Sequence, residues 1–458
     1  MRDVKGAEAL DDATVAVSFA EKRARDVPLY VAGLPIFSKK YYETRAFDES
    51  TLDTPLGSGP YKVGRFEVNR YIEFERVKDW WGADLPVCRG HYNYDTIRYE
   101  FYRDRDVAFE GFAARTYLYR EEFTARIWAT RYDFPALKDG RVKQELVPDE
   151  TPSGGQGWFI NTRREKFEDP RVRRALDYAF DFEWTNKTLF YGAYTRTASY
   201  FANTELASSG LPGPDELKLL EPYRDRLPHE VFDETYQLPV TDGSGNNRDN
   251  LRQAVALLKE AGYEIKGGKL VNAATGEPFG FEILLDSGGL FERIVGPFAK
   301  GLERLGIAVT MRTADDAQYQ KRLDTFDFDM VVATFGQSQS PGNEQRDFWG
   351  SAAADQEGSR NLIGIKDPIV DELIGKIITA HSREDLIAAC RALDRVLLWN
   401  HFVIPQWHNR VTRIAFWDKL DHPAQWPRYG VDLFAWWVNQ GEAAKIDKAR
   451  QDRGAAAN

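Results

Sequence analysis

The chain's 458 residues exceed what one hydrophobic core holds, because cores stop growing at roughly 250 to 300 residues, and we therefore expect two lobes. Apolar residues make up 43% of the chain and charged residues 29%, which is ordinary for a folded globular protein and excludes a disordered one. The formal net charge of −10 excludes a nucleic-acid binder with a basic face. No run approaches the roughly 18 to 20 apolar residues that cross a bilayer.

The region from about 10 to 150 is predicted to consist mostly of short strands. Thr14–Phe19 is an apolar, β-branched run, and Tyr71–Glu75 and Ile97–Phe101 alternate with period two. Asp106–Phe112 is predicted to form a short helix. The beginning, Met1–Gly6, shows no basic-then-apolar secretory pattern and runs directly into the predicted strand, so we expect the chain to be a fragment without a signal peptide.

The pattern changes after Thr151–Gly157, whose glycines favour a flexible linker. Trp158–Asn161 is then predicted as a strand, Asp169–Phe182 as a capped helix and 206–250 as an irregular loop. Strands and helices alternate beyond that point, which indicates an α/β architecture. The predicted helices are Leu251–Ala261, Phe291–Leu305, Ile369–Thr379 and Arg383–Leu398, and the predicted strands are Phe281–Leu285, Ala308–Arg312 and Phe328–Thr334.

Strands return from Val403, including Arg413–Trp417, and a charged tail follows. The simplest explanation is that the chain leaves one lobe near 155 and returns to it near 405. We therefore predict an incomplete, strand-rich lobe I over 1–155, an α/β lobe II over 156–404, and a return to lobe I over 405–458. Two crossings form a hinge, and the cleft between such lobes is a natural ligand site.

Catalytic and metal-binding motifs are missing from the sequence. The six histidines form no HExxH, and there is no GxSxG and no GxxxxGK[ST]. Cys88 and Cys390 lie far apart in the chain, without metal-ligand spacing, and form either one disulfide or two free thiols. The sequence therefore implies no cofactor and no enzyme. A hydrolase stays open as an alternative and would need two carboxylates about 5 to 9.5 Å apart in a cleft.

Four segments resemble one family in order and spacing across most of the chain. They are Pro55–Val63 (PLGSGPYKV), the pair Glu75–Arg76 with Asp79–Gly82 (DWWG), Asn161–Thr162 with Phe167–Ala175 (FEDPRVRRA), and Asn361–Asp371 (NLIGIKDPIVD). Together they are similar to the family 5 extracellular solute-binding proteins of bacterial ABC importers. The resemblance implies a two-lobed periplasmic-binding-protein fold, with mixed β-sheets flanked by helices and a ligand cleft between the lobes.

One loop narrows the resemblance to a branch. Ser338–Trp349 (SQSPGNEQRDFW) looks like the Yej-type subfamily, whose transporters are associated with oligopeptides and the peptide antibiotic microcin C. In the dipeptide binders an acidic residue of this loop pairs with the ligand's amino terminus. Here Ser340–Gly342 replaces the acidic pattern, and Glu344 and Asp347 are displaced onward. Sugar, opine and other peptide-like ligands therefore stay open.

The same loop is a candidate site on physical grounds. It follows the apolar strand ending at Thr334, and ligands of open α/β sheets bind at strand ends. Its short polar side chains offer donors and acceptors, and Gly342 permits close backbone approach. The expected ligand-binding residues in the loop are Gln337, Ser338, Gln339, Ser340, Asn343, Glu344, Asp347 and Trp349.

The aromatic content is high, with 12 Trp, 21 Tyr and 28 Phe, which favours large cores and rings that line a cleft. Trp128 and Tyr132, expected in strands before the hinge, lie where the family's first lobe reaches the cleft, so we add them to the ligand-binding residues. The resemblance implies a monomeric periplasmic protein that binds a peptide or peptide-like compound and delivers it to an inner-membrane ABC permease. An oligosaccharide or opine binder of the same fold is the nearest alternative.

Overall fold

The computed structural model describes residues 3–20, 25–47, 52–288 and 291–446. Residues 447–458 of the predicted C-terminal tail lie outside the described residues. The chain divides into two compact units. The larger unit comprises 1–32 and 151–410, and the smaller unit comprises 33–150 and 411–458. The lobe boundaries expected from the sequence, 1–155, 156–404 and 405–458, stay a prediction.

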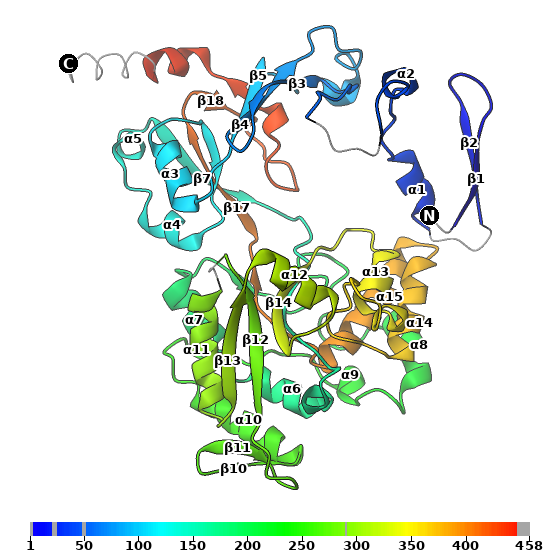
Figure 1. The fold of residues 1–458 in the computed structure, drawn as a ribbon, viewed down its shortest axis with the longest axis vertical. Coiled ribbons are helices and arrows are strands. Elements are labelled where there is room, and N and C mark those ends of the chain that lie inside the picture. The colour runs from blue at the N-terminus through cyan, green and yellow to red at the C-terminus, as the bar shows by residue number, and fades with distance from the viewer. Residues whose placement is uncertain (1–2, 21–24, 48–51, 289–290, 447–458) are drawn as a thin grey trace. The chain divides into compact units, whose positions relative to one another are not determined.

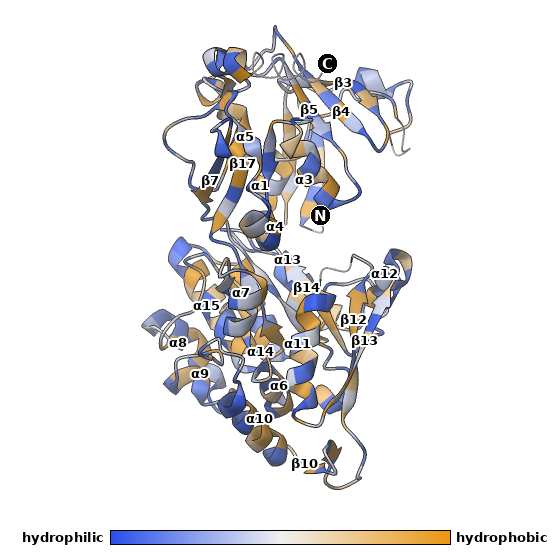
Figure 2. Ribbon diagram, turned by 90° about the vertical axis from the view of Figure 1, so that its left-hand side faces the viewer, coloured by the Kyte–Doolittle hydropathy of each residue, from blue (hydrophilic) through white to orange (hydrophobic). Residues whose placement is uncertain are grey.

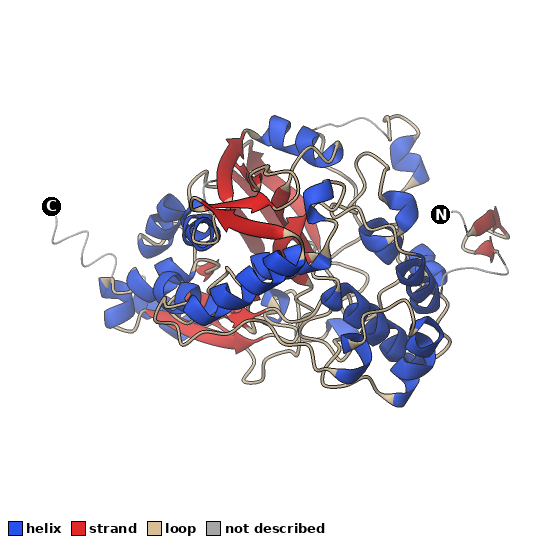
Figure 3. Ribbon diagram, turned by 90° about the horizontal axis from the view of Figure 1, so that it is seen from below, coloured by secondary structure: helices blue, strands red, loops and turns tan. Residues whose placement is uncertain are grey.

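The larger unit alternates helices and strands (Figures 1 and 3). Its strands are β1 (Val4–Ala9), β2 (Val15–Phe19), β8 (Gly155–Ile160), β9 (Thr195–Arg196), β10 (Tyr263–Lys266), β11 (Lys269–Asn272), β12 (Gly280–Asp286), β13 (Ala308–Ala314), β14 (Met330–Phe335), β15 (Val403–Pro405) and β16 (Trp407–His408). Its helices are α1 (Val27–Ala32), α6 (Pro170–Asp177), α7 (Phe182–Leu189), α8 (Pro214–Leu220), α9 (Glu230–Asp233), α10 (Arg248–Glu260), α11 (Glu292–Glu303), α12 (Asp316–Asp324), α13 (Glu344–Trp349), α14 (Pro368–Ile378) and α15 (Arg383–Trp399).

A five-stranded mixed sheet of order β13-β12-β14-β8-β15 forms the centre of this unit. β12 runs parallel to β13 and β14, whereas β8 is antiparallel to both β14 and β15. The two segments expected to form a hinge lie side by side, because Ile404 pairs with Trp158 and Pro405 with Gly157. The sheet therefore brings together two parts of the chain that adjoin the crossings at 150/151 and 410/411.

The core of the larger unit is rich in aromatic side chains. Hydrophobic residues recur along β12 and β14 (orange in Figure 2), and α14 and α15 each bury a broad apolar face. Trp158 is fully buried and stacks on Phe298 at 4.4 Å between ring centroids, with Phe180 edge-on at 4.6 Å. Such rings remove large apolar areas from water, which is the main favourable term in folding.

Several helix ends follow the predicted signals. α10 ends at Glu260 and α11 at Glu303, and each is followed within three residues by a glycine, Gly262 or Gly306, whose φ angles of +87° and +79° are left-handed. The strands predicted at 14–19, 281–285, 308–312 and 328–334 and the helices at 369–379 and 383–398 are all confirmed to within about two residues.

Three predictions for this unit were wrong. The helix expected over Asp169–Phe182 ends at Asp177, because Asp181 caps a second helix by accepting the amide of Trp184 at 3.0 Å. The loop expected over 206–250 contains α8 and α9, and α10 begins at its end. The expected linker is partly a strand, because residues 155–157 pair with β14 and β15.

The described residues of the smaller unit form three small sheets. Its strands are β3 (Tyr61–Glu67), β4 (Tyr71–Arg76), β5 (Thr96–Glu100), β6 (Tyr119–Glu121), β7 (Val142–Pro148), β17 (Val411–Trp417), β18 (Leu420–Asp421) and β19 (Trp437–Val438). Its helices are α2 (Lys39–Tyr42), α3 (Arg105–Ala113), α4 (Ala125–Thr130) and α5 (Pro135–Lys138). The sheet orders are β3-β4-β5, β6-β17-β7 and β18-β19. The returning segment β17 thus lies between β6 and β7, and the strands expected at 71–75, 97–101 and 413–417 are confirmed.

Candidate functional site

The candidate site lies in the larger unit, at the end of the five-stranded sheet where β14 ends and β8 begins. Phe335, the last residue of β14, pairs with Gly155. Gly154 has a φ of +60°, and a Cβ there would come within 1.9 Å of the Phe335 carbonyl oxygen. Only glycine fits this close crossing, which sets the direction in which the chain leaves β14 and enters the loop at 336–343.

The loop is held by its own side chains. The Gln345 side chain donates to Gln337 Oε1 at 2.8 Å, and Glu344 Oε1 accepts the Gly342 amide at 2.8 Å. Ser338 Oγ accepts the Ser340 amide at 3.1 Å. These short-range bonds fix the backbone while leaving Ser338 and Ser340 exposed and Gln337 and Glu344 half-buried.

Two arginines from distant segments brace the loop. Arg383, at the start of α15, donates to the Gln339 carbonyl oxygen and pairs with Glu205 at 2.8 Å. Arg25 donates to Ser340 Oγ at 2.9 Å and to the Pro341 carbonyl oxygen at 3.1 Å. The loop is therefore positioned from outside as well as from within, which a ligand-binding loop needs to be pre-organised.

Asp26 brings a carboxylate to the same place. Its side chain is 7% exposed, and neither carboxylate oxygen has a hydrogen-bond partner among the described residues. It lies directly against Gly342, where a Cβ would come within 2.3 Å of Asp26 Oδ2. A buried carboxylate without a partner is costly, and a cation or an N–H donor from a ligand would relieve that cost.

Two glutamines extend the polar edge along β8 and β15. Gln156 donates to Gln406 Oε1 at 2.8 Å, and Gln406 is fully buried with its own Nε2 unpaired among the described residues. Sequence reasoning missed Gln156, Gln406 and Asp26. Gln156 stands inside the glycine-rich segment that was expected to be a linker, and only the pairing of β15 with β8 brings Gln406 beside it.

The remaining expected loop residues divide into exposed and buried ones. Asn343 precedes α13 and is exposed, and Asp347 is half-buried beside the Arg360 amide at 3.4 Å. Trp349 is fully buried, donates to Gln345 Oε1 at 3.0 Å and packs against Phe335 at 4.7 Å. It presents no surface to a ligand, because the core of the larger unit surrounds it.

Trp128 and Tyr132 belong to the smaller unit. They were expected on strands, but neither lies on one. Trp128 is in α4, and Tyr132 follows that helix. Their rings are 5.0 Å apart, and Tyr132 also packs edge-on against Phe109 at 5.1 Å. Burial raises the pKa of the Tyr132 hydroxyl, so it stays protonated, and it has no hydrogen-bond partner among the described residues. Both rings are half-buried against a small apolar cluster.

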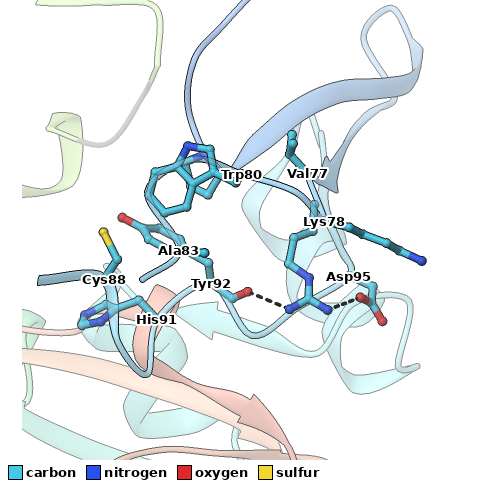
Figure 4. Close-up of a pocket in the computed structure, with 10 residues that line it drawn as sticks. Val77, Lys78, Trp80, Ala83, Cys88, His91, Tyr92 and Asp95 are labelled. Carbon is cyan, nitrogen blue, oxygen red and sulfur yellow. Dashed lines mark hydrogen bonds and ion pairs between the residues drawn. The ribbon is translucent and has the colours of Figure 1, made fainter. Parts of the chain in front are cut away.

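A hollow of about 430 Å³ in the smaller unit gathers residues of two segments quoted for the family resemblance (Figure 4). Its lining residues are Pro60, Arg76, Val77, Lys78, Trp80, Ala83, Cys88, His91, Tyr92 and Asp95. The Ser58 carbonyl oxygen accepts both indole N–H groups of Trp80 and Trp81, at 2.8 and 2.9 Å. These two hydrogen bonds join the PLGSGPYKV segment to the DWWG segment, which gives both motifs a structural role.

No cluster of three or more His, Cys, Asp or Glu that could hold a metal ion occurs in the described part of the chain. Cys88 and Cys390 are both free, with Cys88 half-buried and Cys390 buried, and burial raises the pKa of the Cys390 thiol. Among the described residues, no helix combines the length and apolar character that a membrane span requires.

Comparison with known proteins gives consistent matches. The family of bacterial extracellular solute-binding proteins, family 5 middle, matches residues 1–357. The probable peptide-binding protein YejA of Agrobacterium fabrum is 46% identical over 444 residues, which cover 95% of this chain and 72% of that protein. The peptidoglycan-binding protein YepA of the same organism is 36% identical over 439 residues, covering 94% and 71%.

A solved structure agrees on the fold. The oligopeptide-binding protein AppA of Bacillus subtilis, in complex with a nonapeptide, superimposes with a TM-score of 0.69 at 17% identity, covering 96% of this chain and 79% of that one. The expected fold class, an α/β fold of the periplasmic-binding-protein type with mixed sheets flanked by helices, is confirmed. The chain belongs to the family 5 bacterial extracellular solute-binding proteins, in the Yej-type branch that the Ser338–Trp349 loop indicated.

Proposed function

We propose that this protein is the substrate-binding component of an ABC importer, and that it captures peptides or peptide-like compounds at the loop following β14. The observation that carries the proposal is the unpartnered carboxylate of Asp26 beside the braced polar loop. Asp26 and Glu344 supply negative charge, and Gln337, Gln339 and Asn343 supply neutral donors and acceptors.

Peptides match this combination of groups. Their backbones present N–H donors and carbonyl acceptors at regular spacing, and an amino terminus adds a cation. The carboxylates would bind N–H and ammonium groups through charge-assisted hydrogen bonds, which are stronger than neutral ones. The naming of the Agrobacterium YejA relative as a probable peptide-binding protein supports the same ligand class.

The cellular role follows from the family and is part of the proposal. The protein works in the periplasm as a monomer, without catalysing a reaction, and passes its ligand to an inner-membrane permease. A ligand favours a closed form only as far as it binds that form better than the open one. Release of cleaved peptide during incubation with substrate would contradict the non-enzymatic role and favour the hydrolase alternative.

Calorimetry with peptides of two to nine residues tests the ligand class. The triple variant Gln339→Ala, Asn343→Ala and Glu344→Ala should weaken binding at least about tenfold, because it removes several ligand hydrogen bonds. Its thermal unfolding should stay nearly unchanged, because Asn343 is exposed and Gln339 and Glu344 are half-buried. Unaltered affinity would remove this loop from the site, and parallel loss of affinity and stability would indicate a packing role instead.

Asp26→Asn separates ligand contact from folding. The substitution removes a buried charge without changing the shape of the side chain, so the free protein should become no less stable. Peptide affinity should fall, and acetylating the peptide's amino terminus should reproduce the loss in the wild type but add little in the variant. A variant with wild-type affinity would leave Asp26 without a ligand role.

Peptidoglycan fragments are a second candidate, because the YepA relative is named a peptidoglycan-binding protein. Such fragments carry both sugar hydroxyls and short peptides, and neutral amides in the loop suit both. Calorimetry with a muropeptide, its sugar portion and its peptide portion distinguishes the candidates. Binding of the sugar portion alone would favour the oligosaccharide alternative over the peptide proposal.

A further inference from the structure

Another hollow opens in the larger unit, at the end of the sheet opposite to the loop that follows β14. It has a volume of about 510 Å³ and is lined by Asn246, Arg248, Leu251, Arg252, Val255, Arg304 and Leu305. α10 supplies one wall, and the end of α11 supplies the other. β13 starts three residues after Leu305, which places the hollow beside the amino-terminal ends of the parallel strands.

The helix period places the charges of α10 together. Arg248 and Arg252 are four residues apart, so they lie on one face of the helix. Leu251 and Val255 share the same spacing, and the buried side chain of Leu305 completes an apolar floor. Val255 is 39% exposed, so that floor is open to solvent at its edge.

The arginines of this hollow are poorly compensated by the protein. Neither Arg248 nor Arg304 makes a side-chain hydrogen bond or ion pair with another described residue. Arg252 pairs with Asp249 at 3.0 Å, but both side chains are largely exposed, at 69% and 90%, and such pairs contribute little. Arg248 and Arg252 lie four residues apart on the helix and repel each other. They form a local positive cluster in a chain whose net charge is −10.

The start of α10 adds to the positive field. The Asn247 side chain donates to the Tyr178 carbonyl oxygen at 2.9 Å and makes no capping bond, so no described side chain caps the first amides of α10. The positive end of the helix dipole therefore coincides with Arg248, which is an unfavourable position for a cation unless an anion is bound nearby.

We propose that this arginine hollow binds an organic phosphate that carries a short apolar portion. A phosphate monoester offers three acceptor oxygens and nearly two negative charges, which suit the guanidinium groups of Arg248, Arg252 and Arg304 together. A carboxylate offers only two oxygens and one charge. The apolar floor of Leu251, Val255 and Leu305 would contact the organic portion, so a simple inorganic anion would use only part of the site.

Calorimetry on the whole chain with hexyl phosphate tests the proposal. We expect saturable binding by the wild type, at least about tenfold weaker binding by the Arg248→Gln, Arg304→Gln double variant, and weaker binding of inorganic phosphate and hexanoate. Arg312→Gln, an exposed arginine on β13, is the matched control and should bind like the wild type. No binding of hexyl phosphate, equal binding by the double variant, or equal affinity for hexanoate would overturn the proposal.

Vesicle flotation then separates free phosphates from lipid headgroups. If vesicles with anionic phospholipid retain the wild type but not the double variant, while neutral vesicles retain neither, the source is a membrane lipid. If no vesicle retains the wild type while hexyl phosphate binds, the source is a soluble phosphate. Retention of both proteins by anionic vesicles, without binding of hexyl phosphate, would contradict the site. Peptide affinity should be unchanged in the double variant, so this inference and the proposed function fail independently.

Discussion

The two units of this protein differ in how their cores are built. In the larger unit one large cluster packs α14 and α15 against the central sheet, and it buries residues such as Ile377, Leu397 and Trp349 completely. Among its described residues, the smaller unit forms small clusters around Phe112 and Trp417 and around Phe416 and Trp436.

Exposed apolar residues follow the same division. Trp81, Val87 and Phe101 of the smaller unit are exposed to 71%, 80% and 55%. The candidate ligand loop is on the unit with the large core, which can hold polar side chains in fixed positions. Stability and site geometry should therefore be coupled most tightly in the larger unit.

The largest expected effect concerns Gly154. Gly154→Ala should destabilise the larger unit by at least about 3 kcal/mol, because the new Cβ would collide with the Phe335 carbonyl oxygen and the backbone is left-handed. Gly336→Ala, one residue beyond β14, meets nothing within 4 Å and is the control. Urea unfolding followed by circular dichroism measures both. Equal stability of the two variants would mean that the β8–β14 edge is not the rigid frame described here.

Hydrogen exchange compares the units directly. The slowest amides of β12 and β14 should exchange roughly a hundredfold more slowly than those of β3 and β5, because opening β12 and β14 exposes far more buried apolar surface. Mass spectrometry of peptides from the intact chain gives both rates in one experiment. Equal protection of the two sheets would remove the contrast between the units.

His401 gives the larger unit a pH dependence. Burial, together with Arg174 and Arg173, lowers the pKa of His401 to about 3. The unfolded chain takes up a proton below about pH 6.5 while the folded chain does not, so stability is complete above that pH and falls as pH falls from 6.5 toward 3. The loss should approach about 1.4 kcal/mol per pH unit. Urea titrations at pH 7, 6, 5 and 4 measure it.

His401→Gln should flatten this slope by about one proton. A slope in His401→Gln equal to that of the wild type would mean that His401 takes up its proton in the folded state.

The smallest expected effect lies in the smaller unit. A Cβ at Gly82 would come within 2.6 Å of the Trp80 indole, so Gly82→Ala should displace the ring and weaken its bond to Ser58. We expect a loss of about 1 kcal/mol in stability, because the half-buried Trp80 can shift toward solvent. Gly59→Ala meets nothing within 4 Å and is the control, and tryptophan fluorescence reports the movement. An unchanged emission spectrum in Gly82→Ala would show that the ring is free to adapt.

The sequence predicted most long elements of the larger unit, because apolar periodicity and terminal glycines such as Gly262 are local signals. The prediction failed where contacts with segments distant in the sequence determine the local structure. The polar segment at 206–250 hides α8, which is held by the buried pair of Glu216 with Arg395 of α15 at 2.5 Å. Asp181 is a residue type that caps helices, but the helix predicted over Asp169–Phe182 continued through it.

The candidate site was predictable only in part. The apolar strand ending near Thr334 located the loop, whereas Asp26 and Gln406 reach it through pairings across the fold that no local pattern reveals. Trp349 stands in a polar stretch, so its sequence context suits ligand contact and core packing equally. Only its complete burial distinguishes the two.

Native mass spectrometry of the protein, purified without unfolding, tests the central claim most directly. We expect co-purified mass adducts that fragment into amino-acid series, and we expect the variant with Gln339, Asn343 and Glu344 replaced by alanine to lose them. The Gly336→Ala protein, which leaves those side chains in place, should keep them. Adducts that contain no amino acids, or peptides retained equally by the triple variant, would contradict peptide capture by the loop that follows β14.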